Sequence, residues 1–160
     1  MYLDEMVLRA MRTRLHDPRA ELVVAGFSRL GEHGAVWLAI GVGGWAIDGG
    51  RRAQWRRAVG AVAGTYALNT IVKQIVRRPR PRLAGLPALT STPSRLSFPS
   101  AHAATSVAGA ISYARLGLPV VPLVVLAKGL ALSRLYLGVH YPSDILAGGL
   151  LGAVVAGVAR

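Results

Sequence analysis

The sequence has 160 residues, of which 52% are hydrophobic, a mean hydropathy of +0.42 and a formal net charge of +12. This length bounds the chain to one domain, and its apolar share exceeds that of an ordinary soluble domain of this size. The absence of cysteine excludes disulfides and cysteine-ligated metals, and the arrangement of arginines in short clusters between apolar runs argues against nucleic acid as a partner.

The first 31 residues predict two short helices lying at a membrane surface. The opening stretch mixes acids, arginines and apolar side chains, and it lacks the continuous apolar run and cleavage site of a signal peptide. Apolar side chains recur there at every fourth position: Leu3, Val7, Met11 and Leu15. This pattern predicts an amphipathic interfacial helix. A second short helix is expected to end near Gly31.

Residues 32–160 predict a transmembrane helical bundle. Five apolar runs cover residues 35–47, 58–76, 101–116, 118–132 and 145–159. Each run is near or below the roughly 20 residues that a helix needs to cross a bilayer, so polar residues at the helix ends must lie at membrane depth. We therefore expect one all-α integral membrane domain over residues 1–160, with about five transmembrane helices and the N-terminal interfacial helices.

Only one connection, residues 77–100, is long. It carries five of the nine prolines, which forbids a helix and predicts an ordered or lid-like loop. A helical hairpin over residues 101–132 separates this loop from the stretch 133–144, so both should lie at the same face of the bundle. The end of the second run, near Lys73, reaches that face too.

Polar residues that could form a site are concentrated at this face: Lys73, Arg80, Ser100, His102, Ser133, Arg134, His140 and Asp144. Ionisable groups at membrane depth are costly and mark function by default. The guanidinium groups of Arg80 and Arg134 match phosphate oxygens in a bidentate way, and Lys73 adds a compact charge. Ser100 suits a helix N-cap, which would direct the backbone N–H groups of Ala101 and His102 at an anion.

Two histidines and one carboxylate complete a scheme for phosphoryl transfer. His140 and Asp144 are four residues apart, so the carboxylate can hold one ring nitrogen and leave the other as a nucleophile toward phosphorus. His102 would then protonate the leaving oxygen as general acid. The scheme requires neither a cofactor nor a metal, and the lack of a carboxylate cluster argues against magnesium.

These residues form three ordered motifs: Lys73 with Arg80-Pro81, then Pro99-Ser100-Ala101-His102, then Ser133-Arg134 with His140 and Asp144. In order and spacing, the motifs resemble the signature of the type 2 phosphatidic acid phosphatase superfamily. The resemblance implies a metal-independent membrane phosphatase with His140 as nucleophile, Asp144 as its orienting carboxylate and His102 as general acid.

The resemblance also implies a set of phosphate ligands: Lys73, Arg80, Ser100, Arg134 and the amide of Ala101. One position departs from the family pattern, because the second motif normally has glycine where this chain has Ala101. This departure bears on how closely the backbone approaches the phosphate.

Each polar residue also has a simpler interpretation when it is taken alone. Lys73 could extend its amine to the membrane surface, Asp144 could cap the last helix, and Ser133-Arg134 could anchor the interface. His16 and His33 are interpreted as surface or interface residues, and the sequence gives no role to Lys128. The chemical interpretation requires all the candidate groups to meet at one face.

The substrate and the orientation stay open at this stage. Seventeen arginines against two lysines are typical of a GC-rich bacterial genome, which favours a polyprenyl-linked phosphate of cell-wall synthesis: decaprenylphosphoryl-5-phosphoribose or a polyprenyl pyrophosphate. Phosphatidylglycerol phosphate, phosphatidic acid and transfer to an acceptor other than water are alternatives. Arginines opposite the site favour an extracytoplasmic site in the bacterial plasma membrane, with membrane lipids and the lipid phosphate as partners.

Overall fold

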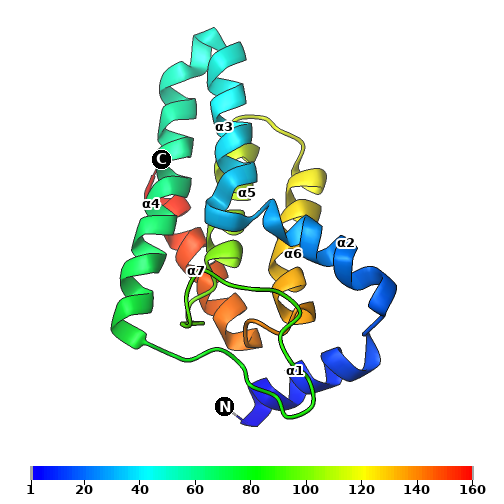
Figure 1. Cartoon of the computed structure of the whole chain (residues 1–160). Coiled ribbons are helices and arrows are strands. Elements are labelled where there is room, and N and C mark those ends of the chain that lie inside the picture. The colour runs from blue at the N-terminus through cyan, green and yellow to red at the C-terminus, as the bar shows by residue number, and fades with distance from the viewer. Residues whose placement is uncertain (1, 160) are drawn as a thin grey trace.

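Seven helices make up the chain, as described for residues 2–159 by a computed structural model (Figure 1). They are α1 (Tyr2–Arg14), α2 (Pro18–Arg29), α3 (Ala35–Ile47), α4 (Arg52–Val76), α5 (Ala101–Ala114), α6 (Val120–Tyr136) and α7 (Pro142–Val158). Two short 3-10 turns join them, η1 (Glu32–Gly34) before α3 and η2 (Gly49–Arg51) before α4. The predicted all-helical class is confirmed.

The helix boundaries follow the apolar runs closely, and the two largest differences are in α4 and α6. α3 has the predicted bounds, whereas α4 begins at Arg52, six residues before the predicted run 58–76, and so includes arginines. α6 extends to Tyr136 and carries Ser133 and Arg134 within its last turn. Within residues 2–159, no helix combines the length and the apolarity that crossing a membrane requires. The number of transmembrane helices therefore stays a prediction.

Helix α5 lies at the centre of the bundle and packs against α4, α6 and α7 (Figure 1). Its contact with α7 is close because Gly148 and Gly152 present no side chain. A Cβ atom on Gly148 would collide with the Ser100 carbonyl, and one on Gly152 would collide with the carbonyl of Ala104. The backbone N–H of Ser100 donates to the Asp144 carbonyl at 3.0 Å. The first turns of α5 and α7 are thus fixed against each other.

An aromatic core joins α3, α4 and α5. Trp37, Trp55 and Tyr113 are buried, and the Tyr113 ring lies 6.3 Å from Trp37 and 5.7 Å from Trp55 between ring centroids. The Trp37 indole donates to the Ser106 hydroxyl at 3.0 Å, and the Tyr113 hydroxyl donates to the Trp37 carbonyl at 2.7 Å. This core fixes the positions of the helices whose other ends carry the polar motifs.

The segment between α4 and α5 contains no helix, as its proline content predicts. In Figure 1 it crosses the lower end of the bundle and approaches α1. Two hydrogen bonds of 2.8 and 2.9 Å order it, from the Ser97 N–H to the Arg78 carbonyl and from the Leu89 N–H to the Leu137 carbonyl. The loop therefore lies over the turn between α6 and α7, at the face where the sequence places the site.

Candidate active site

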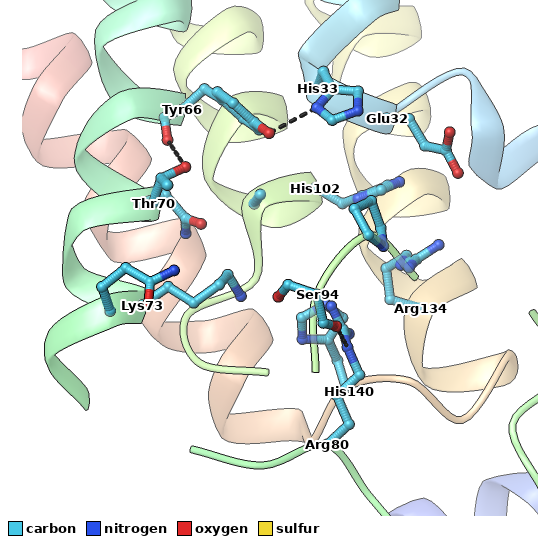
Figure 2. A pocket seen from close by; sticks show the side chains of 14 residues that line it. Glu32, His33, Tyr66, Thr70, Lys73, Arg80, Ser94, His102, Arg134 and His140 are labelled. Carbon is cyan, nitrogen blue, oxygen red and sulfur yellow. Dashed lines mark hydrogen bonds between the residues drawn. The ribbon is translucent and has the colours of Figure 1, made fainter. Parts of the chain in front are cut away.

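A cavity of about 130 Å³ opens where α4, α5, α6 and the long loop meet (Figure 2). Six of the eight predicted site residues line it: Lys73, Arg80, Ala101, His102, Arg134 and His140. The other two, Ser100 and Asp144, are fully buried beside it. The structure thus brings the residues of all three motifs together at one place.

His140 and Asp144 form a hydrogen-bonded pair in the turn before α7 and its first turn. Nδ1 of His140 lies 3.4 Å from Oδ2 of Asp144, and the same oxygen accepts the Tyr141 N–H at 2.8 Å. Burial lowers the pKa of His140 to about 3, with the Asp144 carboxylate opposing this shift and the nearby cations Arg80 and Arg134 adding to it. The ring is therefore neutral, with its proton on Nδ1 and its electron pair on Nε2.

Arg80 holds the nucleophilic side of this ring. Its Nη1 donates to the Val139 carbonyl at 2.7 Å and lies 3.1 Å from Nε2 of His140, while its Nε donates to the Ser94 carbonyl at 2.8 Å. Burial lowers the pKa of Arg80 to about 10, which leaves the guanidinium charged at neutral pH. A cation thus lies beside the atom that would attack phosphorus.

Ser100 occupies the N-cap position of α5, but its hydroxyl does not cap the helix. The side chain makes no capping hydrogen bond, and Oγ is buried without a partner among the described residues. The predicted N-cap position is confirmed by the extended backbone angles of Ser100, although Oγ bonds to none of the first N–H groups. An unpartnered buried hydroxyl is costly, so this one requires a partner that the described residues do not supply.

Ser28 at the end of α2 organises two cavity residues. Its hydroxyl accepts Nη1 of Arg134 at 2.8 Å, while Nε of Arg134 has no partner among the described residues. Its carbonyl accepts Nε2 of His102 at 2.9 Å. This bond fixes the proton of a neutral His102 on Nε2 and leaves Nδ1 for a transferable proton. The Ser133 hydroxyl donates to the Ser28 hydroxyl at 3.0 Å, so Ser133 helps to position Ser28.

Lys73 bonds to the loop as well as lining the cavity. Its Nζ donates to the carbonyls of Leu96, Ser97 and Pro99 at 3.2, 3.2 and 3.0 Å. These three bonds use all three ammonium hydrogens. Lys73 therefore fixes the end of the loop and contributes positive charge to the cavity through space.

Arg78, which has no predicted role, holds the buried carboxylate from the other side. Its Nη1 donates to Oδ1 of Asp144 at 2.9 Å, and its Nη2 donates to Oδ2 of Asp4 at 2.8 Å. Asp4 in turn accepts the hydroxyl of Ser143 at 2.6 Å. The interfacial helix α1 is thus tied to the His140–Asp144 pair. The pairs lie 66 and 74 residues apart, so only the folded structure reveals them.

Replacing Arg78 with methionine is expected to lower kcat about tenfold or more, because Asp144 would lose its cationic partner in a buried site. KM should stay within about twofold, since Arg78 does not line the cavity. Steady-state phosphate release from a lipid phosphate measures both constants. Arg82→Met, an exposed arginine of the same loop, is the matched control. An unchanged kcat would show that Arg78 does not position the pair.

A polar face of α4 also escaped the sequence analysis. Tyr66, Thr70 and Gln74 recur at four-residue spacing on α4, and all three line the cavity. This spacing was visible in the sequence as a polar stripe. His33, interpreted as a surface residue, is exposed and lines the cavity with Glu32. Lys128 is exposed on α6 and forms no ion pair with another described residue.

Comparison with known proteins places this arrangement among phosphatases. Residues 54–160 match the PAP2 superfamily. A protein from Mycobacterium tuberculosis (strain CDC 1551 / Oshkosh), named decaprenylphosphoryl-5-phosphoribose phosphatase, is 40% identical over 154 residues, which cover 95% of this chain and 86% of the relative.

Two crystal structures share the fold. Aquifex aeolicus LpxE has a TM-score of 0.83 at 23% identity, covering 98% of this chain and 94% of that one. The first transmembrane PAP2 type phosphatidylglycerolphosphate phosphatase from Bacillus subtilis has a TM-score of 0.80 at 24% identity, covering 99% and 83%. At this identity the likeness concerns the fold alone.

Proposed function

We propose, since this chain belongs to the PAP2 superfamily, that it hydrolyses a lipid-linked phosphate through a phospho-histidine intermediate on His140. The observation that carries the proposal is the hydrogen-bonded pair of His140 and Asp144, with Nδ1 held at 3.4 Å and Nε2 facing a cavity that Arg80 and Arg134 make positive. A neutral imidazole so oriented is a nucleophile poised for an anionic phosphate.

The phosphate ligands in this proposal are the groups without other partners. The Ser100 hydroxyl and Nε of Arg134 are buried and unpaired, and phosphate oxygens would satisfy both. When the substrate binds, Nη1 of Arg80 would donate to a phosphate oxygen instead of to Nε2 of His140. The electron pair on Nε2 would then be free to attack phosphorus. Lys73 and the Ala101 N–H would add stabilisation of the charge that grows on the equatorial oxygens.

The first chemical step forms a bond from Nε2 of His140 to phosphorus and breaks the bond to the leaving oxygen. His102, with Nε2 held by the Ser28 carbonyl, would first take up a proton at Nδ1 from the entering phosphate and then give it to that oxygen, so the lipid leaves as a neutral alcohol. Asp144 stabilises the positive charge that the phosphorylated ring acquires. In the second step water attacks phosphorus, His102 takes up its proton, and inorganic phosphate and neutral His140 are regenerated.

Our proposed substrate is decaprenylphosphoryl-5-phosphoribose, the compound in the name of the M. tuberculosis relative. Support comes from the extent of that match, which spans 95% of this chain. We place the enzyme in a bacterial plasma membrane because large apolar side chains are exposed on the outer faces of its helices. Examples are Ile47, Val121, Leu150 and Val158. An extracytoplasmic site remains our preference from the arginine distribution.

A phosphate-release panel on the purified protein in detergent tests this function. The panel contains decaprenylphosphoryl-5-phosphoribose, a polyprenyl pyrophosphate, phosphatidylglycerol phosphate and phosphatidate, each with and without a chelator. We expect release that the chelator does not reduce, fastest with the phosphoribose compound. Release from none of the four would contradict the proposal, and release only with an added alcohol acceptor would favour a transferase.

Substitution of Ala101 by glycine is expected to leave turnover within about threefold. Ala101 begins α5 and does not have the positive φ that would require glycine, so its N–H can face a phosphate in either form. The measurement is kcat/KM with the best substrate of the panel. Near-total loss of turnover would instead show that the methyl group contacts the substrate.

A further inference from the structure

The cavity is larger than a phosphate group requires. One water molecule needs about 10–15 Å³ of cavity volume. A cavity of about 130 Å³ therefore has room for on the order of ten atoms of the size of a water oxygen. A phosphate group would occupy the end beside Arg80, His140 and Ser100. The remainder is large enough for a second chemical group of comparable size.

The remaining end of the cavity is polar. Figure 2 shows Glu32, His33 and Tyr66 at one end and Arg80 and His140 at the other, with Thr70 between them on α4. A hydrocarbon chain would offer the polar atoms of these side chains no further hydrogen bonds, which makes direct contact with the lipid tail unfavourable. A group that carries hydroxyls matches them instead.

Among these residues, Glu32 restricts the chemistry of that group most strongly. Its side chain is half-buried, and it forms no hydrogen bond or salt bridge with another residue in the range 2–159. It supplies the only carboxylate among the described lining residues. A carboxylate repels phosphate but accepts hydrogen bonds from two neighbouring hydroxyls with its two oxygens. The charge thus also sets which end of the cavity receives the phosphate.

His33 and Tyr66 form a rigid wall beside Glu32. The backbone of His33 has a φ of 52°, a left-handed conformation that is strained for this residue and that packing must hold in place. Nδ1 of His33 and the Tyr66 hydroxyl share a hydrogen bond of 2.6 Å, and the two rings meet edge to face at 5.5 Å. Strain of this kind is concentrated at functional sites, where it fixes the position of a contact group.

We propose that Glu32, with Tyr66 and Thr70, binds the hydroxyls of a sugar that carries the phosphate. This subsite rests on the proposed function, because it orients the phosphate bond for attack by His140. It gives the enzyme a preference for phosphates borne on a sugar over phosphates attached directly to a lipid chain. The recognition element is an adjacent pair of hydroxyls, as on ribose.

Glu32→Gln tests the subsite, because it removes the charge and keeps the shape. Three substrates are compared in detergent: decaprenylphosphoryl-5-phosphoribose, its 2,3-dideoxy analogue and decaprenyl phosphate. For the wild type, kcat/KM with the ribose compound should exceed that with the dideoxy analogue by about tenfold or more. Glu32→Gln should remove this difference by lowering the ribose value alone. Tyr66→Phe should lower the same value selectively, and it serves as a second variant.

Glu21→Gln is the matched control, because it makes the same change in a carboxylate that pairs with His16 outside the cavity. It should leave all three rates unchanged. Equal losses on all substrates in Glu32→Gln, or no loss on any, would overturn the subsite while leaving the phosphatase reaction intact. Absence of phosphate release from every substrate by the wild type would instead overturn the proposed function, and the subsite with it.

Discussion

Replacing His140 with glutamine is expected to lower phosphate release at least about a thousandfold, which corresponds to about 4 kcal/mol of lost transition-state stabilisation. Glutamine can still donate to Asp144 and accept from Arg80, the two contacts that His140 makes here. It cannot supply a nitrogen that forms a bond to phosphorus. The loss should therefore fall on kcat, and substrate binding should persist.

A second readout separates nucleophilic attack from a structural role of His140. Rapid quenching of the wild type with labelled substrate should trap label on the protein in an acid-labile, alkali-stable form, and His140→Gln should trap none. His16→Gln, the same change at an exposed position between α1 and α2, should behave like the wild type. Turnover by His140→Gln within tenfold of the wild type would remove the phospho-histidine from the mechanism.

The second large effect concerns His102 and depends on the leaving group. His102→Asn keeps a donor for the Ser28 carbonyl but has no proton to transfer. We expect kcat/KM for an alkyl phosphate to fall by about 10²–10⁴-fold, the usual contribution of a general acid. A phosphate ester of 4-nitrophenol should lose far less, because its phenolate leaves without protonation. Measuring both substrates on both proteins gives the comparison.

Equal losses with the two leaving groups would assign His102 to positioning instead of proton transfer. The thermal unfolding midpoint of His102→Asn in detergent provides the stability control. We expect a small change, because the amide replaces a buried imidazole that is already hydrogen-bonded at 2.9 Å. A selective loss at unchanged stability would support the role of acid.

Local patterns predicted the helices well because each apolar run ends at polar or proline-rich sequence. The bounds of α3 agree with the predicted 35–47, and α5 begins at Ala101 directly after Ser100, as predicted. The start of α4 was misjudged because its arginines resemble a loop in composition, although the structure makes them helical. The convergence of the motifs could also be predicted, because successive helices of a bundle run in opposite directions. Two connections separated by a helical hairpin therefore lie at the same face.

Contacts between distant segments could not be predicted from the sequence. The bond from Arg134 to Ser28 spans 106 residues and the ion pair of Arg78 with Asp4 spans 74. No local periodicity encodes such pairs, because they depend on how α1 and α2 lie against the bundle. The polar stripe of α4 is a different case. Its four-residue spacing is visible in the sequence, but uncharged side chains on a helix do not by themselves indicate a site.

The close contact of α5 with α7 at Gly148 and Gly152 has a consequence for how such an enzyme can diverge. This contact fixes the positions of the groups proposed to perform the chemistry, since Ser100 and Asp144 lie at the starts of the two helices. Glu32 and His33 belong to a separate turn, η1, which contributes no residue to the contact between α5 and α7. Substitutions of Glu32 and His33 can therefore accumulate without disturbing that contact. A lineage could thus acquire a new substrate while inheriting its reaction unchanged.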